Sequence, residues 1–239
     1  MIRGDGGNAV ALLFVARSPD NHTMFIGHFA LGFAAKRVAP RVSLAALFGA
    51  AQFADLLWPV LVATGLEEVR IDPGNTASTP LDFVSYPYSH SLLALAVWGL
   101  LFGWICWKKA PGALVFATIF ALAVSHWLLD VAVHRPDMPL YPGSAKLGLG
   151  LWNHPVLERL LEMIMYGAGL MVYVRATRPL DGTGRWALWS LAAFLFVGYL
   201  ASGTPPPSVS VLWMMALGLG GLTLVWAWIA DHHREAMYD

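Results

Sequence analysis

The chain has 239 residues, of which 57% are hydrophobic and only 13% are charged. Soluble domains carry about 25% charged residues, so this composition excludes an ordinary soluble protein and indicates an integral membrane protein. Fifteen basic and fifteen acidic residues give a net charge of zero, so the overall charge balance indicates neither nucleic acid nor an acidic partner. The sole cysteine, Cys106, excludes an intrachain disulfide and a cysteine-based metal site.

The first 23 residues are expected to lie outside the helical core. They contain Arg3, a short apolar run from Ala9 to Ala16 and the polar segment "RSPDNHT". This order loosely resembles a signal peptide, but so short an apolar run is near the minimum for one. We expect residues 1–23 to form a disordered tail, or an extension upstream of a start at Met24.

Six apolar stretches are long enough to cross a bilayer, which takes about 20 helical residues. A shorter stretch, Met24–Ala35, precedes them and is amphipathic or half-spanning. Prolines and glycines cluster between the stretches. We therefore expect an all-α, polytopic transmembrane bundle, with a helical core over residues 24–177 and two C-terminal transmembrane helices with a short tail over residues 178–239. The six predicted spans are Ser43–Leu66, Ser89–Lys109, Gly112–His134, Pro155–Thr177, Arg185–Ser202 and Ser208–Ala230.

Charges in the connections predict the orientation of these spans. Basic connections alternate along the chain with connections that are acidic, mixed or uncharged, and basic loops favour the cytoplasmic side. The acidic residues of the first outer connection are read as an exposed loop face. The basic residues are Lys36, Arg37, Arg41, Lys108, Lys109, Arg175, Arg178 and Arg185, and the acidic ones are Glu67, Glu68, Asp72 and Asp82.

The segment "ALAVSHWLLDVAVHRPDMPLYP", Ala121–Pro142, places three ionisable residues inside an apolar run. His126, Asp130 and His134 follow one another at four-residue intervals. Four residues advance an α-helix by about 400°, so the three side chains drift by only about 80° while they climb about 12 Å. They form one polar stripe, and ionisable groups in hydrocarbon are costly unless they have partners.

Further ionisable residues fall at the same predicted outer level of the membrane. Imidazoles and carboxylates that converge without cysteine suit zinc or, less specifically, manganese, iron or nickel. A proton or ion path and a structural polar cluster are the alternatives, but a proton path needs fewer such groups and a structural cluster favours Ser, Thr, Asn and Gln. The predicted metal ligands are His28, Asp55, His90, His126, Asp130, His134, His154 and Glu158.

Roles within this set are also predicted. Asp130, at its centre, is the candidate to bridge two metal ions, and Asp55 or Glu158 is the candidate to accept a proton from water. Asp137 and Glu162 are expected to orient a ligand imidazole or to pair with the neighbouring arginines.

Four short segments carry a family resemblance: "GHFALGFAAK", "FADLLWP", "YSHSLL" and "SHWLLDVAVHRPDMPLYP". Over Gly27–Thr177 they resemble the YdjM-like family of membrane-bound metal-dependent hydrolases. More remotely, the order of the predicted ligands is similar to that of the zinc-dependent phospholipase C and P1 nuclease group. The chain departs from the family pattern at Leu57, where a second acidic residue is common, and at Ser85 and Tyr86, where a His-Arg pair is common.

The resemblance implies a hydrolase with two or three zinc ions that acts on a phosphoester, with a membrane phospholipid as one form of that substrate. The loop charges direct this site to the non-cytoplasmic side, and we expect a bacterial inner-membrane protein that interacts with membrane lipid and not with nucleic acid. The alternative is a non-catalytic metal-binding protein or a metal or proton transporter, although the inner helix halves show no polar route. The oligomeric state is left open.

Overall fold

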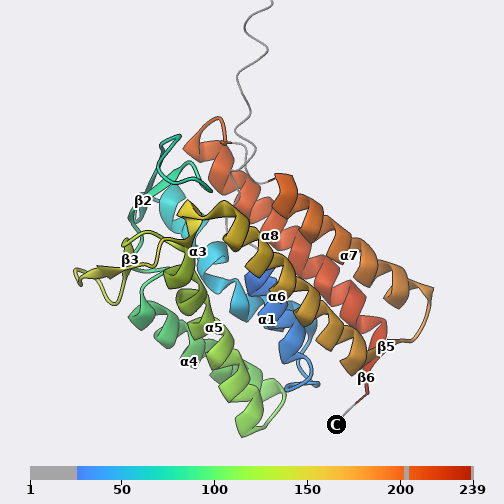
Figure 1. Ribbon diagram of the computed structural model, residues 1–239. Helices are drawn as coiled ribbons and strands as arrows, with labels where there is room; N and C mark the ends of the chain where they lie inside the picture. The colour runs from blue at the N-terminus through green and yellow to red at the C-terminus, as the bar shows by residue number, and fades with distance from the viewer. Residues whose placement is uncertain (1–25, 202–204, 238–239) are drawn as a thin grey trace, which may run out of the picture.

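A computed structural model describes residues 26–201 and 205–237, and within these ranges the chain is an all-α bundle with two short hairpins and one further pair of short antiparallel strands (Figure 1). The prediction for residues 1–23 lies outside the described residues. The helices are α1 Ile26–Ala35, α2 Leu44–Ala51, α3 Phe53–Ala63, α4 Leu92–Lys109, α5 Ala113–Val133, η2 Leu151–Asn153, α6 Pro155–Ala176, α7 Gly182–Ala201 and α8 Val209–His232. The antiparallel strand pairs are β1 Glu68–Ile71 with β2 Leu81–Ser85, β3 Met138–Pro139 with β4 Lys146–Leu147, and β5 Thr177–Pro179 with β6 Arg234–Ala236.

The short helix α1 lies in the interior of the bundle. It packs most extensively against α6, and it also meets α2, α5 and α7. The pair α4–α5 lies on one side of the bundle in Figure 1 and the pair α7–α8 on the other. One buried core joins α1 and α2 to α6, α7 and α8, and a second joins the end of α1 and α2 to α5. Both cores therefore hold α1 in place.

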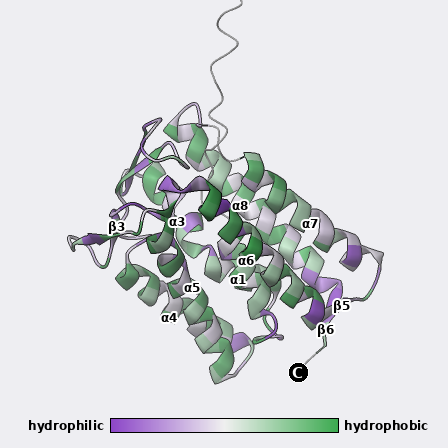
Figure 2. Cartoon of the chain, in the orientation of Figure 1, coloured by the Kyte–Doolittle hydropathy of each residue, from purple (hydrophilic) through white to green (hydrophobic). Residues whose placement is uncertain are grey.

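Four described helices, α4, α5, α7 and α8, are long and apolar enough to cross a membrane. The bent pair α2–α3 would make a fifth span. This is fewer than the six predicted, because α6 is long enough but carries four charged residues, namely Glu158, Arg159, Glu162 and Arg175. Hydrophobic residues dominate the helices in Figure 2, whereas hydrophilic residues gather at the hairpins. These apolar helices fit an integral membrane protein.

The predicted span Ser43–Leu66 is not one continuous helix but two helices that meet at Gln52. Its two halves, α2 and α3, meet at an angle of 58°. Gln52, with φ −105° and ψ 12°, departs from helical geometry. The break leaves the Ala51 carbonyl at the end of α2, where it accepts a hydrogen bond from the His126 side chain. A helix end buried in an apolar bundle needs such a partner.

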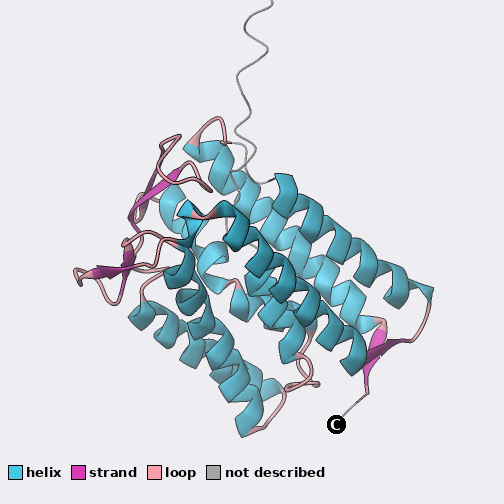
Figure 3. Cartoon of the chain, viewed as in Figure 1, coloured by secondary structure: helices cyan, strands magenta, loops and turns pink. Residues whose placement is uncertain are grey.

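The three strand pairs lie at two opposite ends of the bundle (Figure 3). The pairs β1–β2 and β3–β4 lie at one end, and β5–β6 lies at the other, beside the C-terminus. Arg135, which follows α5, links elements of the first end because its guanidinium pairs with Asp82 on β2 and donates to Asn75. Asp82 therefore forms an ion pair with Arg135, and the prediction that it belongs to an exposed loop face is wrong.

A buried ion pair ties the opposite end together. Lys36 Nζ, just after α1, lies 2.7 Å from Asp231 Oδ2 on α8 and 2.9 Å from the Val42 carbonyl oxygen. Asp231 also accepts hydrogen bonds from the Leu44 amide at 3.0 Å and the Tyr173 hydroxyl at 2.8 Å. The carboxylate thus connects α8 with α2, α6 and the segment after α1.

Candidate metal centre

Five of the predicted ligands converge in the bundle interior. His28 comes from α1, Asp55 from α3, His90 from the turn before α4, and His126 and Asp130 from α5. They form two groups of three, His28–His126–Asp130 and Asp55–His90–His126, and the ligand atoms within each group lie within 4.8 Å of one another. The helical spacing of His126 and Asp130 therefore aims both at one point, as predicted.

The distances between these atoms fit a shared cation. Asp130 Oδ1 lies 3.2 Å from His28 Nε2, and Asp130 Oδ2 lies 3.2 Å from His126 Nε2 and 3.9 Å from His90 Nε2. Asp55 Oδ1 lies 3.4 Å from His90 Nε2 and 3.8 Å from His126 Nε2. Direct charge-assisted N–H···O bonds are about 2.7–2.9 Å long. Tetrahedral zinc with ligands about 2.0–2.2 Å away separates them by about 3.3–3.6 Å.

His126 presents a nitrogen suited to binding a metal. Its Nδ1 lies 2.8 Å from the Ala51 carbonyl oxygen, which can only accept, so Nδ1 carries the proton of the neutral ring. The lone pair is then on Nε2, which is buried and has no hydrogen-bond partner among the described residues. A buried nitrogen left in this state is costly, and a cation bound between it and the carboxylates would remove that cost.

His90 also presents a free lone pair on Nε2, because hydrogen bonds through Ser89 to Glu67 fix its proton on Nδ1. Ser89 Oγ lies 2.7 Å from His90 Nδ1 and donates its own proton to Glu67 Oε2 at 2.6 Å. Glu67 Oε1 also accepts the amides of Tyr88 at 2.7 Å and Ser89 at 2.9 Å. Because the hydroxyl proton is used, Ser89 accepts from Nδ1–H, and the His90 lone pair is on Nε2, facing Asp55.

Glu67 is the functional residue that sequence reasoning missed. The sequence predicts an exposed loop residue, whereas Glu67 is only 4% exposed. Its neighbour Glu68 is exposed as predicted and pairs with Arg70. No spacing rule relates Glu67 to Ser89, which lies 22 positions away and meets it only when the β1–β2 hairpin folds back.

His134 lies near the two groups but belongs to neither. Its Nδ1 lies 2.9 Å from Asp137 Oδ1, which also accepts the Tyr86 hydroxyl at 2.8 Å. Burial raises the pKa of the Asp137 carboxyl, but hydrogen bonds from His134, Tyr86 and Arg135 outweigh burial and hold this pKa below its ordinary value. Asp137 is therefore ionised and orients His134, as the sequence predicted, and it also pairs with Arg135.

The structure does not bring His154 and Glu158 into the cluster. His154 is exposed at the start of α6. Glu158 is fully buried beside Tyr199 of α7 and belongs to neither group. Glu162 accepts the amides of Ile26 at 3.0 Å and Gly27 at 2.9 Å, so it caps the helix that carries His28 instead of orienting an imidazole.

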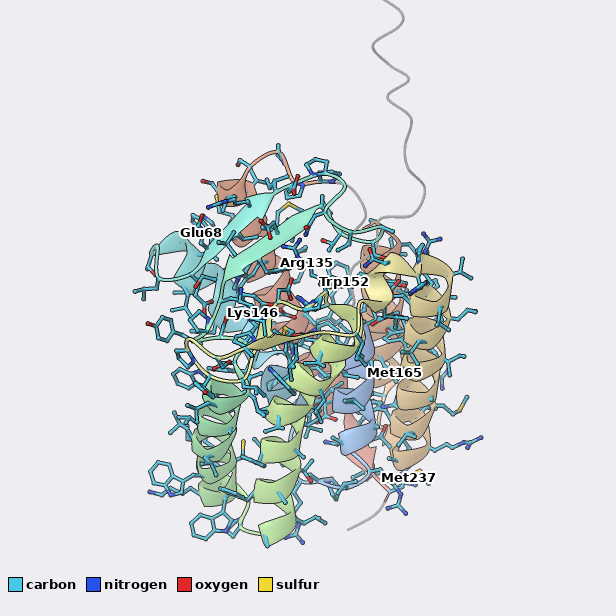
Figure 4. The ribbon with its side chains drawn as sticks, turned by 60° about the vertical axis from the view of Figure 1, so that its left-hand side comes forward. Glu68, Arg135, Lys146, Trp152, Met165 and Met237 are labelled. Carbon is cyan, nitrogen blue, oxygen red and sulfur yellow. The ribbon has the colours of Figure 1, made fainter. Side chains whose placement is uncertain are left out.

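A cavity of about 230 Å³ opens onto the cluster. Asp55 is the ligand most open to it, because its side chain is 44% exposed whereas those of His90, His126 and Asp130 are at most 6% exposed. Figure 4 shows Trp152, which lines this cavity, at the same end of the bundle as Glu68 and opposite Met237. Most of the remaining lining is apolar and comes from α3, α8 and β2.

Comparison with protein-family models, with curated proteins and with solved structures found no match. The function is therefore inferred from the geometry of the cluster and its cavity. The local resemblance in "SHWLLDVAVHRPDMPLYP" and the three other segments enters only as support for a proposal.

Proposed function

We propose that the chain is an integral membrane, metal-dependent hydrolase of phosphoesters, with zinc as the favoured metal. One observation carries the proposal: the free Nε2 atoms of His90 and His126 face the carboxylates of Asp55 and Asp130 at 3.2–3.9 Å, beside an open cavity. Imidazole and carboxylate are the usual ligands of catalytic zinc. The YdjM-like segments support the same class of reaction.

The donor set fits more than one metal ion. His126 has a single free nitrogen, because Ala51 occupies Nδ1, so it cannot serve as a ligand in both groups at once. Asp130 directs Oδ1 toward His28 and Oδ2 toward His126 and His90, which suits a bridge between two ions. Two ions would use every ligand atom of the cluster, and the third ion implied by the resemblance would need further ligands.

Zinc bound in such a site lowers the pKa of water to about 7 and stabilises negative charge on an ester oxygen. In this chain Asp55 takes the proton-accepting role, because its carboxylate faces the cavity that would admit both water and ester. Glu158, the other residue predicted for this role, does not line the cavity. His28, His90, His126 and Asp130 would hold the metal and fix its position.

The proposal includes a bacterial inner-membrane location with the site on the non-cytoplasmic side. The basic connections after α1, between α4 and α5, and after α6 lie at the end of the bundle that contains β5–β6. The cluster lies toward the opposite end, with β1–β4. Basic loops favour the cytoplasm, so this arrangement directs the site outward. A purely structural metal, the alternative, is usually enclosed by four protein ligands, whereas Asp55 opens to a cavity.

Metal analysis of the purified protein tests the proposal. We expect more than one equivalent of a zinc-type metal per chain, and hydrolysis of bis(p-nitrophenyl) phosphate that chelators abolish. His126→Ala should lose both metal and hydrolysis. His154→Ala is the matched control and should keep both, because His154 is exposed and lies outside both groups. Folded protein that binds no metal would overturn the proposal.

A further inference from the structure

Helix α8, which carries none of the predicted metal ligands, forms one wall of the cavity. The lining residues of α8 recur at intervals of three and four, so they share one face of the helix. Between the first and the last of them, α8 rises about 18 Å. The residues are Leu212, Ala216, Leu219, Gly220, Thr223 and Leu224.

The cavity has a polar end and an apolar body. The metal-binding side chains occupy the polar end, and Leu56 and Trp58 of α3 face the α8 wall together with Phe29 and Phe83. None of the described lining residues is a lysine or an arginine. Without bound metal the two carboxylates would repel an anion, so any recognition of phosphate depends on the metal-bearing end. Apart from Gln52 and Thr223, whose hydroxyl already donates to the Leu219 carbonyl oxygen, the residues of the body offer apolar contact.

The apolar body lies at membrane depth. Its α8 wall belongs to a helix that is long and apolar enough to cross the bilayer. Leu219 lines the cavity and is 43% exposed, so this wall of the cavity is open and not sealed by neighbouring side chains. The volume of about 230 Å³ is smaller than the pockets of about 300–1,000 Å³ that enclose whole small ligands. A ligand would therefore enter in part and keep the rest in the surrounding lipid.

From this geometry we propose that the cavity binds an amphiphile of the membrane, with its phosphate at the metal-bearing end and the adjoining part of its hydrocarbon chain along the α8 face. The effect of hydrocarbon chain length on kcat/KM rests on the proposed hydrolase activity. Binding of the hydrocarbon chain does not. For an ester that enters from water, burial of each methylene contributes up to about 0.8 kcal/mol, a factor of about four in kcat/KM, whereas a chain that enters from lipid gains little because lipid is equally apolar. Chain length should therefore determine which esters in solution react best.

Two small residues set the width of the apolar body. A side chain added at Gly220 would begin 2.6 Å from Leu56 Cδ2, so α8 and α3 already approach closely there. Ala216 lies one turn away on the same face. Ala216→Phe would add bulk to the α8 wall at a residue that is not itself a proposed metal ligand. Gly218→Phe is the control, because Gly218 is exposed, has no atom within 4 Å of an added Cβ and does not line the cavity.

The first experiment measures hydrolysis of methyl, hexyl and dodecyl p-nitrophenyl phosphates by the full-length metal-loaded protein. Wild type should show kcat/KM rising with chain length, and Gly218→Phe should keep that rise. Ala216→Phe should lower the dodecyl-to-methyl ratio of kcat/KM at least about tenfold, which corresponds to excluding two or more methylenes, with metal content at the wild-type level. The same ratio in Ala216→Phe as in wild type would overturn the proposal.

The second experiment separates chain binding from hydrolysis. Dodecylphosphonate should raise the Tm of the metal-loaded protein more than methylphosphonate does, and Ala216→Phe but not Gly218→Phe should shrink that difference. This result in a protein that hydrolyses none of the esters would sustain the chain site and refute the hydrolase. Hydrolysis of the methyl ester, with no effect of hydrocarbon chain length in either experiment, would support the hydrolase and refute the chain site.

Discussion

Three histidines at the cluster and its cavity, His90, His126 and His134, donate their Nδ1 protons to chemically different acceptors. His126 donates to the backbone carbonyl of Ala51, His90 donates to the hydroxyl of Ser89, and His134 donates to a carboxylate. Each arrangement leaves the lone pair on Nε2, and such partners fix both the tautomer and the ring orientation. At the residue scale, the site therefore depends on groups that never touch the cavity.

Glu67→Gln tests this dependence. If the amide oxygen replaces Oε1, the amide NH₂ faces Ser89 and donates to it, so Ser89 must turn its own proton toward His90 Nδ1. The His90 lone pair would then move from Nε2 to Nδ1. We expect a loss of metal affinity of about 10–100-fold, measured by competition with a chelator, and a changed ¹⁵N NMR signature of His90.

Glu68→Gln is the matched control, because Glu68 is exposed and pairs only with Arg70. Equal effects of the two substitutions on metal affinity would show that Glu67 has no specific positioning role.

Asp130→Asn tests the bridging carboxylate. The substitution removes the negative charge that offsets the metal cations, so metal content, Tm and hydrolysis should fall together. Asp72→Asn, in an exposed turn of the β1–β2 connection, is the control and should change none of these. An Asp130→Asn protein that is more stable than wild type and retains its metal would identify Asp130 as a poorly compensated buried charge.

At the residue scale, the sequence predicts the convergence of candidate ligands where the residues lie on the same helix. The four-residue spacing of His126 and Asp130 places both at one point, and five of the eight predicted ligands converge. His154 and Glu158 stay apart because the turn that begins α6 leaves the first exposed and buries the second beside α7. Contacts between distant loops, such as that of Glu67 with Ser89, have no periodic signal in the sequence.

At the scale of the elements, the position of α1 depends on its close packing against α6 at Gly169. An added Cβ at Gly169 on α6 would lie 2.7 Å from the Ala30 Cα on α1, closer than folded proteins allow. Gly169→Ala should therefore push away the helix that carries His28. Overpacking of this kind costs about 1–3 kcal/mol, so we expect a lower Tm by thermal unfolding and a reduced metal content.

Gly167→Ala on the same helix provides the comparison. No atom lies within 4 Å of an added Cβ at Gly167, and alanine is about 1 kcal/mol more favourable than glycine in a helix. Its Tm should be unchanged or higher. A loss of stability in both variants would assign the effect to α6 itself and not to its contact with α1.

Hydrophobic periodicity predicts most of these elements but not their interruptions. The bounds of the long helices lie within three residues of the predicted stretches, because uninterrupted apolar residues favour membrane helices. The break at Gln52 is not visible in the sequence, since glutamine is an adequate helix former and the break is compensated by a distant histidine. The hairpins β1–β2 and β3–β4 fall in the predicted connections, because strands of two to five residues are too short to give a periodic signal.

At the scale of the whole molecule, the two ends of the bundle differ in charge and in role. Thiol labelling in a Cys106→Ser background tests which end faces outward. Tyr141→Cys, beside β3, should react with an impermeant reagent applied to intact cells, whereas Thr183→Cys, at the β5–β6 end, should react only after permeabilisation. Labelling of Thr183→Cys alone in intact cells would reverse the orientation and place the site toward the cytoplasm.

The Asp231 carboxylate on α8 also has a consequence for biosynthesis. Lys36 and the Leu44 amide are made early, but the acceptor that satisfies them belongs to the last helix to leave the ribosome among those described. Until α8 inserts, the ammonium group of Lys36 lacks its counter-ion and the cavity lacks its α8 wall. The nascent chain thus carries all of its metal-binding side chains before it can enclose them, and synthesis of α8 is the step that commits the protein to its mature form.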